Sequence, residues 1–343
     1  MGLAVDSKYL ISQKEMPSMF LSYYLIFLKE LIKKISSNHN EMLPIVNHPD
    51  YVAQIGDDHR FPIKKFGELF NHLKKEKILN NDNLHIPEPA KYNDLIKAHQ
   101  IEYIKKIDNL SLSKEEERKL GFPMVPSVRR RSYMATGGTV LAAELALKYK
   151  LACNTAGGSH HAFSDSGNGY CVFNDVAVAT YNLLDKHAVK KILIYDLDVH
   201  QGDGTAKIFE NNNQVFTLSI HSKTNYPLIK QRSDKDIELP NDITDEEYLN
   251  TVSKSLEIVN KMNFNFVFYV AGVDIHKDDK LGKLNISTEG IIKREKMVIN
   301  NFYKNKVPLC GVLGGGYNKD FDHLIYLHSI LHKTCHGVLN NEY

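Results

Sequence analysis

Short apolar segments alternate with longer helical stretches along most of the chain, and this alternation is the feature that most constrains the fold. The apolar segments are continuous, without alternating polar residues, which is typical of strands buried on both faces. Such strands, separated by helices, predict an α/β fold: one mostly parallel sheet with helices on both faces. The predicted strands are 151–155, 191–196, 215–220, 264–271 and 307–313. The predicted helices are 66–77, 135–149, 174–185, 245–262 and 288–303.

The alternation begins near Met42, and residues 42–343 are predicted to form one domain because no internal repeat or low-complexity linker interrupts them. Residues 1–41 form an extension of different character. Within it, residues 16–35 are first apolar and then lysine-rich, and the apolar part is too short and too polar to span a bilayer. Three interpretations stay open: an amphipathic surface helix, a weak membrane-interface anchor, or non-native sequence upstream of a start at Met42.

The charge of the chain argues against nucleic acid as a partner. The 43 Lys and Arg residues nearly balance the 41 Asp and Glu residues, and no dense basic run could follow a phosphate backbone. The short basic stretches 129–131 and 74–77 are interpreted as solvated faces. The four cysteines are far apart and form no Cys-x-x-Cys pair, which argues against disulfides or a structural zinc site and favours a reducing, cytoplasmic location.

Acidic residues are concentrated directly after the predicted strand 191–196, in the segment IYDLDVHQGDGT. Such a density of acids is costly in a core unless a metal ion or hydrogen bonds compensate. Alternation along the extended chain places Asp198 and His200 on the same side, so both can bind one ion. Catalytic zinc sites use three imidazole or carboxylate ligands, and Asp274, which follows another apolar strand, supplies the third. An isolated Asp-x-His also fits a surface turn.

A histidine pair, His160 and His161, follows two glycines after the predicted strand 151–155. Neighbouring imidazoles with separate carboxylate partners can have different protonation states and different roles in acid–base catalysis. Asp196 and Asp203 are available as these partners because neither is needed as a zinc ligand. A structural alternative has one histidine hydrogen-bonded in a loop and the other solvated.

A tyrosine, Tyr317, follows three glycines at the end of the predicted strand 307–313. Its phenol could donate a hydrogen bond to a developing oxyanion. A glycine run before tyrosine equally fits a tight turn with a buried tyrosine. The glycine run does not fit a phosphate-binding loop, because the Lys-Ser/Thr ending and the Gly-x-Gly-x-x-Gly spacing are both missing. The sequence also has no Gly-x-Ser-x-Gly elbow, which argues against a serine hydrolase.

Four segments together resemble the zinc-dependent histone deacetylase family, which has the arginase–deacetylase fold. In chain order they are GGSHHAFSDSGNGYCVFND, DLDVHQGDGT, AGVDIHKDDKLGKLNIS and LGGGYN. The likeness extends from about residue 43 to the C-terminus. Within the family the sequence looks most like class IV deacetylases and their bacterial relatives, on the basis of HRFP at 59–62, TGGTVLAAELAL from 136 and LGKLNISTEGIIKR at 281–294. The three glycines before Tyr317, where class I enzymes typically carry four, leave the acyl preference open.

The resemblance implies a zinc-dependent amidohydrolase acting on N-acyl-lysine of a protein or peptide, with zinc on Asp198, His200 and Asp274. The likeness to class IV suggests that long fatty acyl chains are removed better than acetyl, whereas the wider family removes acetyl from lysine or polyamines. Family members also bind a structural monovalent cation, and K⁺ is expected here. Its ligands would be Asp196, Asp198, His200, Ser219 and Ile220.

The resemblance also assigns roles beside the metal. His161, oriented by Asp203, would be the general base and later the proton donor. His160, oriented by Asp196, would assist electrostatically. Tyr317 would polarise the scissile carbonyl. The narrow channel for the acylated side chain would be lined by Gly169 and Tyr170.

Rival functions stay open at this point. A ureohydrolase on the same fold would bind two manganese ions, but it needs a longer series of bridging acids, part of which the histidine pair replaces here. A non-catalytic module would hold an acylated lysine without cleaving it. The sequence leaves the physiological substrate and the oligomeric state undetermined.

Overall fold

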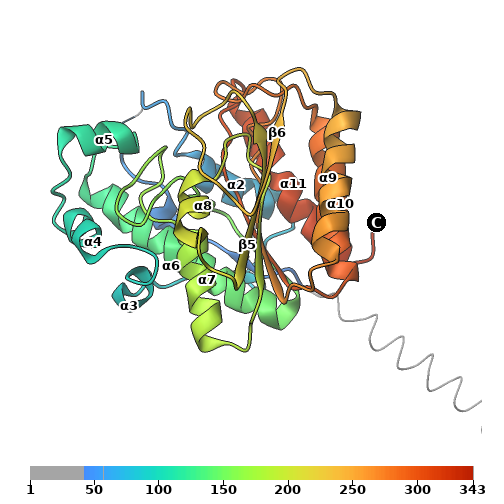
Figure 1. Cartoon of the computed structure of the whole chain (residues 1–343), viewed down its shortest axis with the longest axis horizontal. Coiled ribbons are helices and arrows are strands. Elements are labelled where there is room, and N and C mark those ends of the chain that lie inside the picture. The colour runs from blue at the N-terminus through green and yellow to red at the C-terminus, as the bar shows by residue number, and fades with distance from the viewer. Residues whose placement is uncertain (1–41, 57, 343) are drawn as a thin grey trace, which may run out of the picture. The chain divides into compact units, whose positions relative to one another are not determined.

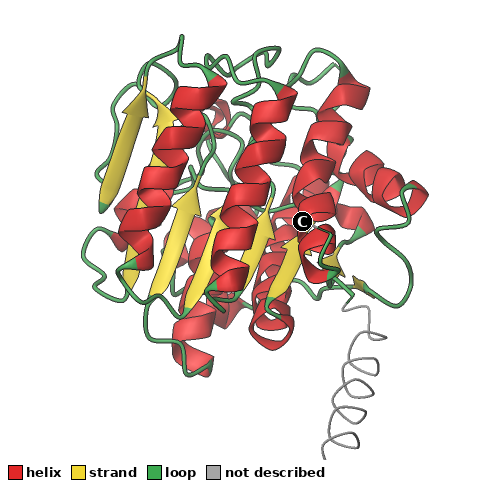
Figure 2. Ribbon diagram, turned by 90° about the vertical axis from the view of Figure 1, so that its right-hand side faces the viewer, coloured by secondary structure: helices red, strands yellow, loops and turns green. Residues whose placement is uncertain are grey.

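The computed structural model describes residues 42–56 and 58–342, and a parallel sheet forms their centre. The strands are β1 (Ile45–Val46), β2 (Leu84–His85), β3 (Leu151–Asn154), β4 (Ile192–Asp196), β5 (Val215–Ser222), β6 (Lys235–Leu239), β7 (Phe266–Val270) and β8 (Leu309–Val312). Their order in the sheet is β2-β1-β3-β8-β7-β4-β5-β6, and all neighbours are parallel. Figure 2 shows the strands pointing toward the same edge. The predicted parallel α/β sheet is confirmed.

Helices cover both faces of this sheet (Figure 1). They are α2 (Lys65–Lys75), α3 (Tyr92–Leu95), α4 (Ile101–Asp108), α5 (Lys114–Leu120), α6 (Pro126–Tyr149), α7 (Asp175–Lys186), α8 (Asp203–Phe209), α9 (Asp245–Asn260), α10 (Thr288–Lys304) and α11 (Phe321–Leu339), with a 3₁₀ turn, η2 (Pro49–Tyr51). Helices α6, α7 and α8 lie on one face, whereas α9, α10 and α11 lie on the other, and α2 packs against α11.

The predicted helices and strands are present, with most ends shifted by one or two residues. The largest difference is α6, which begins at Pro126 and not at residue 135. Proline suits the first turn of a helix because the N–H that it lacks would have no intrahelical partner there. The helix therefore begins well before the segment from which it was predicted.

The central strands explain the continuous apolar segments. Every residue of β4 and β7 is buried, because helices cover both faces of the sheet there. In register, Asp196 at the end of β4 lies between Ser219 of β5 and Val270 of β7. The segments that follow β4, β7 and β8 therefore leave the middle of the sheet side by side, which is where ligands bind in open α/β sheets.

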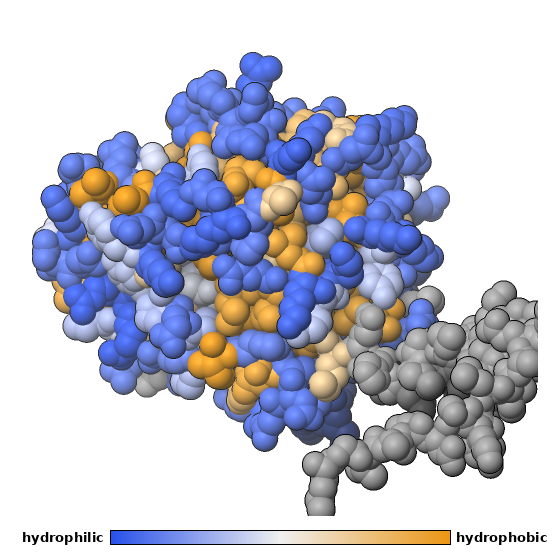
Figure 3. All heavy atoms as spheres, turned by 90° about the horizontal axis from the view of Figure 1, so that it is seen from below, coloured by the Kyte–Doolittle hydropathy of each residue, from blue (hydrophilic) through white to orange (hydrophobic). Residues whose placement is uncertain are grey.

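The opposite edge, at which the strands begin, has a mixed surface. Figure 3 views the molecule from this side and shows apolar side chains interspersed among hydrophilic ones. Met42 and Tyr149, which precede β1 and β3, are exposed hydrophobic residues of this end. Within the described part of the chain, no helix has both the length and the apolarity needed to cross a membrane. The interpretations of residues 1–41, including membrane contact through 16–35, lie outside the described residues.

Candidate active site

Three buried side chains meet beyond the ends of two neighbouring strands. Asp198 and His200 follow β4, and Asp274 follows β7. One potential ligand atom from each lies within 4.8 Å of the other two. Nδ1 of His200 is 3.1 Å from Oδ1 of Asp198 and 3.0 Å from Oδ2 of Asp274. The structure thus brings together the three residues that the sequence predicts as metal ligands.

The electrostatics of these residues fit a bound cation. Burial, together with the charge of Asp198, raises the pKa of Asp274 to about 7 despite the nearby His200. Oδ2 of Asp274 is buried, and within the described residues it accepts no hydrogen bond from outside the group; its contact at 3.0 Å is with Nδ1 of His200, another predicted ligand. Two adjacent buried carboxylates are unfavourable unless a positive charge lies between them. Two carboxylates and one imidazole are a donor set that suits zinc.

Backbone groups hold the two carboxylates in place. The N–H of Gly315 donates to Oδ2 of Asp198, and the N–H of Val199 donates to Oδ1 of Asp274 at 3.0 Å. A Cβ atom on Gly315 would lie 1.9 Å from Oδ2 of Asp274. Glycine is therefore required at this position, because any side chain would push the loop after β8 away from the ligands.

Each residue of the histidine pair has its own carboxylate. Nδ1 of His160 donates to Oδ2 of Asp196 at 2.7 Å, and Nδ1 of His161 donates to Oδ1 of Asp203 at 2.6 Å. Because a carboxylate only accepts hydrogen bonds, Nδ1 of each ring carries a proton, and Nε2 is the atom of each ring that remains for other partners. The ring centroids are 4.1 Å apart. These are the pairings that the family resemblance implies.

The two imidazoles differ in charge at neutral pH. Burial favours the neutral form of His160, but Asp196 and Asp198 outweigh it and raise the pKa to about 9. Burial, with the positive charge of His160, lowers the pKa of His161 to about 4 against the effect of Asp203. His160 is therefore cationic, and His161 is neutral and able to accept a proton.

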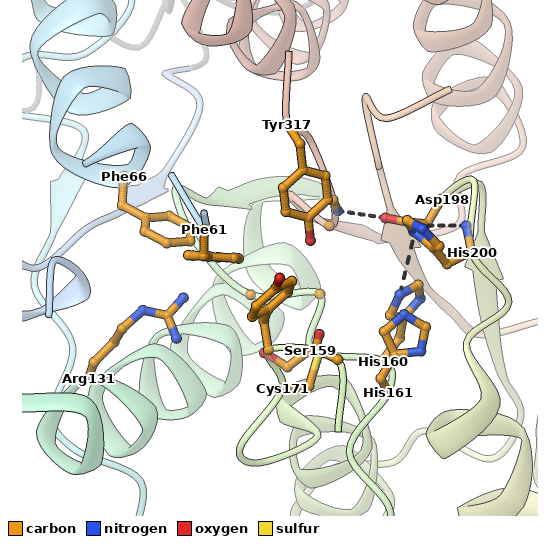
Figure 4. Close-up of a pocket in the computed structure, with 16 residues that line it drawn as sticks. Phe61, Phe66, Arg131, Ser159, His160, His161, Cys171, Asp198, His200 and Tyr317 are labelled. Carbon is orange, nitrogen blue, oxygen red and sulfur yellow. Dashed lines mark hydrogen bonds and ion pairs between the residues drawn. The ribbon is translucent and has the colours of Figure 1, made fainter. Parts of the chain in front are cut away.

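Tyr317, Gly169 and Tyr170 line a narrow cavity of about 40 Å³ together with the histidine pair. Figure 4 shows the phenol of Tyr317 pointing into this cavity. Burial raises the pKa of Tyr317 well above its usual value, so the hydroxyl stays protonated and can donate. Gly169 has φ +50°, and a Cβ atom there would lie 2.7 Å from Cδ2 of His161. The channel loop can approach His161 only because this residue is glycine.

A wider cavity of about 300 Å³ opens outward from the narrow one. Both cavities are lined by His161, Gly169, Tyr170, His200 and Tyr317. The outer cavity is also lined by Arg60, Arg118, Lys119, Leu120, Gly121, Asn225, Tyr226 and Leu281. A narrow inner part with a broad opening suits an extended side chain that is attached to a larger molecule.

Comparison with known proteins identifies the family. Residues 59–330 match the model described as the histone deacetylase domain. The chain belongs to the histone deacetylase family.

Similar proteins agree with this membership. An uncharacterized protein of Picosynechococcus sp. is 41% identical over 296 residues, which cover 86% of this chain and 99% of that protein. Histone deacetylase 2 of Arabidopsis thaliana is 29% identical over 272 residues, covering 76% of this chain and 70% of that protein. The crystal structure of an HDAC homolog from Aquifex aeolicus matches with a TM-score of 0.74 and 27% identity, covering 86% of this chain and 84% of that chain. The arginase–deacetylase fold is confirmed, and family membership implies a deacetylase-type hydrolase; placement in class IV stays a prediction.

The residues predicted to bind potassium lie within or directly after two neighbouring strands, β4 and β5. Ser219 and Ile220 are buried in β5, and Ser219 lies beside Asp196 in register. Asp198 and His200 follow directly after β4. The potassium ion itself stays a prediction.

One residue that supports the candidate active site, Asp175, was not identified from the sequence. Its carboxylate accepts the N–H groups of Gly158 at 3.1 Å and Ser159 at 2.7 Å, and the hydroxyl of Thr139 at 2.5 Å. It therefore fixes the turn that leads into the histidine pair. Asp175 is the first residue of α7, and acids are common there because they stabilise the helix. The sequence therefore does not distinguish Asp175 from an ordinary acid at the start of a helix.

Arg294 is a second supporting residue without a clear sequence signal. It is fully buried in α10, and its guanidinium donates to the carbonyl oxygens of Gly272 at 2.7 Å and Leu197 at 3.3 Å. These carbonyls belong to the segments that carry the metal ligands. In the sequence, Arg294 stands among other charged residues and resembles part of a solvated helix face.

The interpretation of residues 129–131 as a solvated face is wrong for Arg131. Its guanidinium is buried, lines the narrow cavity and lies 4.7 Å from the ring centroid of Phe66. Lys65 is also buried there, and burial lowers the pKa of its amine to about 8. Figure 4 shows Arg131 and Phe66 on the side of the cavity opposite the histidine pair.

Proposed function

We propose that this protein is a zinc-dependent hydrolase of N-acyl-lysine, with the chemistry contained in residues 42–343. The observation that carries the proposal is the buried group of Asp198, His200 and Asp274 next to a neutral histidine. The protein's place in the histone deacetylase family supports the same reaction. When bound, zinc would polarise the scissile carbonyl and lower the pKa of an attacking water.

The histidine pair supplies the proton transfers. His161 removes a proton from the attacking water through Nε2 and then gives it to the leaving lysine amine. Asp203 holds Nδ1–H of this ring, so the ring keeps Nε2 toward the cavity. Asp196, which accepts the Nδ1–H of His160, favours the protonated form of this ring, and a positive charge there would stabilise the anionic transition state.

Tyr317 completes the site. Its protonated phenol donates a hydrogen bond to the oxygen on which negative charge develops. The backbone N–H of Tyr317 donates to Oδ2 of Asp279 at 2.6 Å, which holds the start of the side chain in place. A donor that is fixed before the reaction stabilises the transition state without a reorganisation cost.

The substrate side chain fits the two connected cavities. Gly169 and Tyr170 line both of them, so they would flank the lysine stem while the peptide stays in the outer cavity. A potassium ion held by Asp196, Ser219 and neighbouring groups belongs to the same proposal. All four cysteines are free and buried, which supports a cytoplasmic location.

The test is hydrolysis of acetyl-lysine and myristoyl-lysine peptides and of an acetylated polyamine by the purified full chain, with its metal content measured. We expect a single zinc ion per chain, release of free lysine side chains, loss of activity with a chelator and recovery with zinc. A zinc-loaded protein that hydrolyses no acyl-lysine would be a binding module, which would refute the proposal. Two manganese ions per chain and cleavage of a guanidino substrate would instead indicate a ureohydrolase.

A further inference from the structure

Cationic side chains line one wall of the outer cavity. Arg60, Arg118 and Lys119 are all exposed there, and none of the residues that line this cavity is Asp or Glu. Within residues 42–56 and 58–342, none of the three forms an ion pair. Their charges are therefore available to a bound molecule.

Two of these cations are attached to the channel itself. Arg118 and Lys119 stand at the end of α5, where the carbonyl of Lys119 accepts the N–H of Gly169 at 3.3 Å. The carbonyl of Leu120 accepts the N–H of Tyr170 at 2.7 Å. The end of α5 is thus hydrogen-bonded to the loop that lines the channel, so the backbone that carries both cations is fixed beside the channel mouth.

The third cation is held on the same wall by its neighbours in sequence. Nε2 of His59 hydrogen-bonds to the carbonyl oxygen of Gly121 at 3.0 Å, and its ring stacks on Phe122 with centroids 5.4 Å apart. The ring of Phe61 lies 5.1 Å from that of Tyr170. Arg60 stands between these two anchored residues, so its backbone position is fixed.

The other wall adds no negative charge. It is formed by neutral residues, Asn225, Tyr226 and Leu281. The amine of Lys230 donates to the carbonyl of Asn225 at 2.6 Å, which places another cation behind this wall. The nearby carboxylate of Asp279 is buried and accepts N–H groups from Leu281, Gly282 and Tyr317, so it is turned away from the opening.

We propose that this cationic entrance selects acyl-lysines that lie in an acidic peptide segment. The inference rests on the proposed function, because the acyl-lysine must occupy the narrow cavity for its flanking residues to reach Arg60, Arg118 and Lys119. Asp and Glu beside the modified lysine are attracted to this wall, whereas Lys- and Arg-rich segments and polyamine cations are repelled. The entrance therefore disfavours strongly basic peptide substrates.

Matched peptides provide the test. Three peptides carry the same acyl-lysine, flanked on both sides by Asp and Glu, by Ser and Gly, or by Lys and Arg. At low ionic strength we expect kcat/KM to fall by roughly tenfold from the acidic to the basic peptide, mainly through KM, with the neutral peptide between them. The difference should shrink to about twofold at high salt, because the screening length then falls to about 3 Å.

Charge reversal locates the effect. Arg118→Glu/Lys119→Glu should reverse the order of the acidic and basic peptides, and Arg118→Gln/Lys119→Gln should abolish the preference. The matched control is Lys190→Glu/Lys254→Glu, which makes the same change of charge at exposed residues that do not line the cavity and should keep the original order. Equal thermal unfolding midpoints would show that the variants are folded.

The outcomes separate this inference from the proposed function. Hydrolysis of all three peptides at equal rates, or a preference for the basic peptide or the polyamine, overturns the acidic-segment inference and leaves lysine deacylation intact. Failure to hydrolyse any peptide, with zinc bound, overturns the proposed function itself. If the control variant changed the peptide preference as much as the α5 variant does, the preference would arise from the overall charge of the protein and not from the entrance.

Discussion

The proposed metal-binding cluster (Asp198, His200 and Asp274) and the polar network at the start of α7 (His99, Asn174 and Asp175) are both buried, but their hydrogen bonds differ. In the cluster, Oδ2 of Asp274 contacts Nδ1 of His200, another predicted ligand, at 3.0 Å, and within the described part of the chain it accepts no hydrogen bond from outside the cluster. In the network, both ring nitrogens of His99 have partners: Nδ1 lies 3.0 Å from the carbonyl oxygen of Phe163, and Nε2 accepts the N–H of Asn174 at 2.9 Å. Asp175 likewise uses both carboxylate oxygens.

This difference separates residues that bind a ligand from residues that hold the fold. A buried polar atom without a partner outside its own group is unfavourable, so where it faces a cavity among other potential ligand atoms it indicates a place that suits an ion or a substrate. A buried polar atom with partners contributes to stability and to the position of its neighbours. Substitutions in the cluster should therefore impair activity, whereas substitutions in the network should first lower stability.

The largest effect is expected from the metal site. Asp274→Asn should lower kcat/KM by at least about a thousandfold and strongly reduce zinc content, because the ion loses a charged ligand. The free energy of unfolding of the metal-free protein should change little, since the substitution removes repulsion from Asp198 together with the ion pair to His200. Activity assays, metal analysis and urea unfolding measure the three quantities. A marked loss of metal-free stability would mean that Asp274 belongs with the network.

The second-largest loss of activity is expected from Tyr317→Phe. It removes only the hydroxyl, so we expect kcat to fall by about two to three orders of magnitude while zinc content stays the same. Steady-state kinetics and metal analysis test this. An unchanged kcat would remove Tyr317 from the mechanism.

Asp175→Ala tests the network. It leaves two backbone N–H groups and the hydroxyl of Thr139 without their acceptor, which should cost about 3 kcal/mol of unfolding free energy. Asp175→Asn keeps one acceptor oxygen and should cost less. Denaturant unfolding of both variants gives the comparison. If Asp175→Ala lost activity with full stability, the division between the two regions would not hold.

The smallest effect is a pH dependence of stability. Burial lowers the pKa of His99 from 6.5 to about 4, so between these values the unfolded chain binds more protons than the folded one. Stability should therefore fall as the pH decreases, by about 2 kcal/mol between pH 6.5 and pH 5 from this residue. His99→Gln should show a shallower slope in unfolding measured across this range. An equal slope in both proteins would assign the pH dependence to other groups.

The sequence predicted the centre of the fold and the cluster because both leave local patterns. Strands buried on both faces are continuously apolar, and the acids and histidines follow them directly. Helix α11 was not predicted, because most of its residues are buried and its polar stripe is narrow. Strands β1 and β2 have only two residues each, and β6 is partly exposed, so none of the three forms a long apolar segment in the sequence.

The supporting residues could not be predicted for a different reason. Arg131 has the same local sequence environment as its exposed neighbour Arg130, and only the packing of α6 decides which of them is buried. The entrance combines Arg60 with Arg118 and Lys119, which are far apart in the chain. Their proximity depends on hydrogen bonds to the channel loop, and these bonds cannot be predicted from a local sequence pattern.

The strand order also has a consequence for synthesis of the chain. Strand β8, the last to be made, pairs with β3 on one side and β7 on the other, so it joins the two halves of the sheet. Until it leaves the ribosome, β3 and β7 are unpaired edges, which invite association with other chains. The loop that brings Gly315 against Asp198 follows β8, so a nascent chain completes the proposed metal site only near the end of translation.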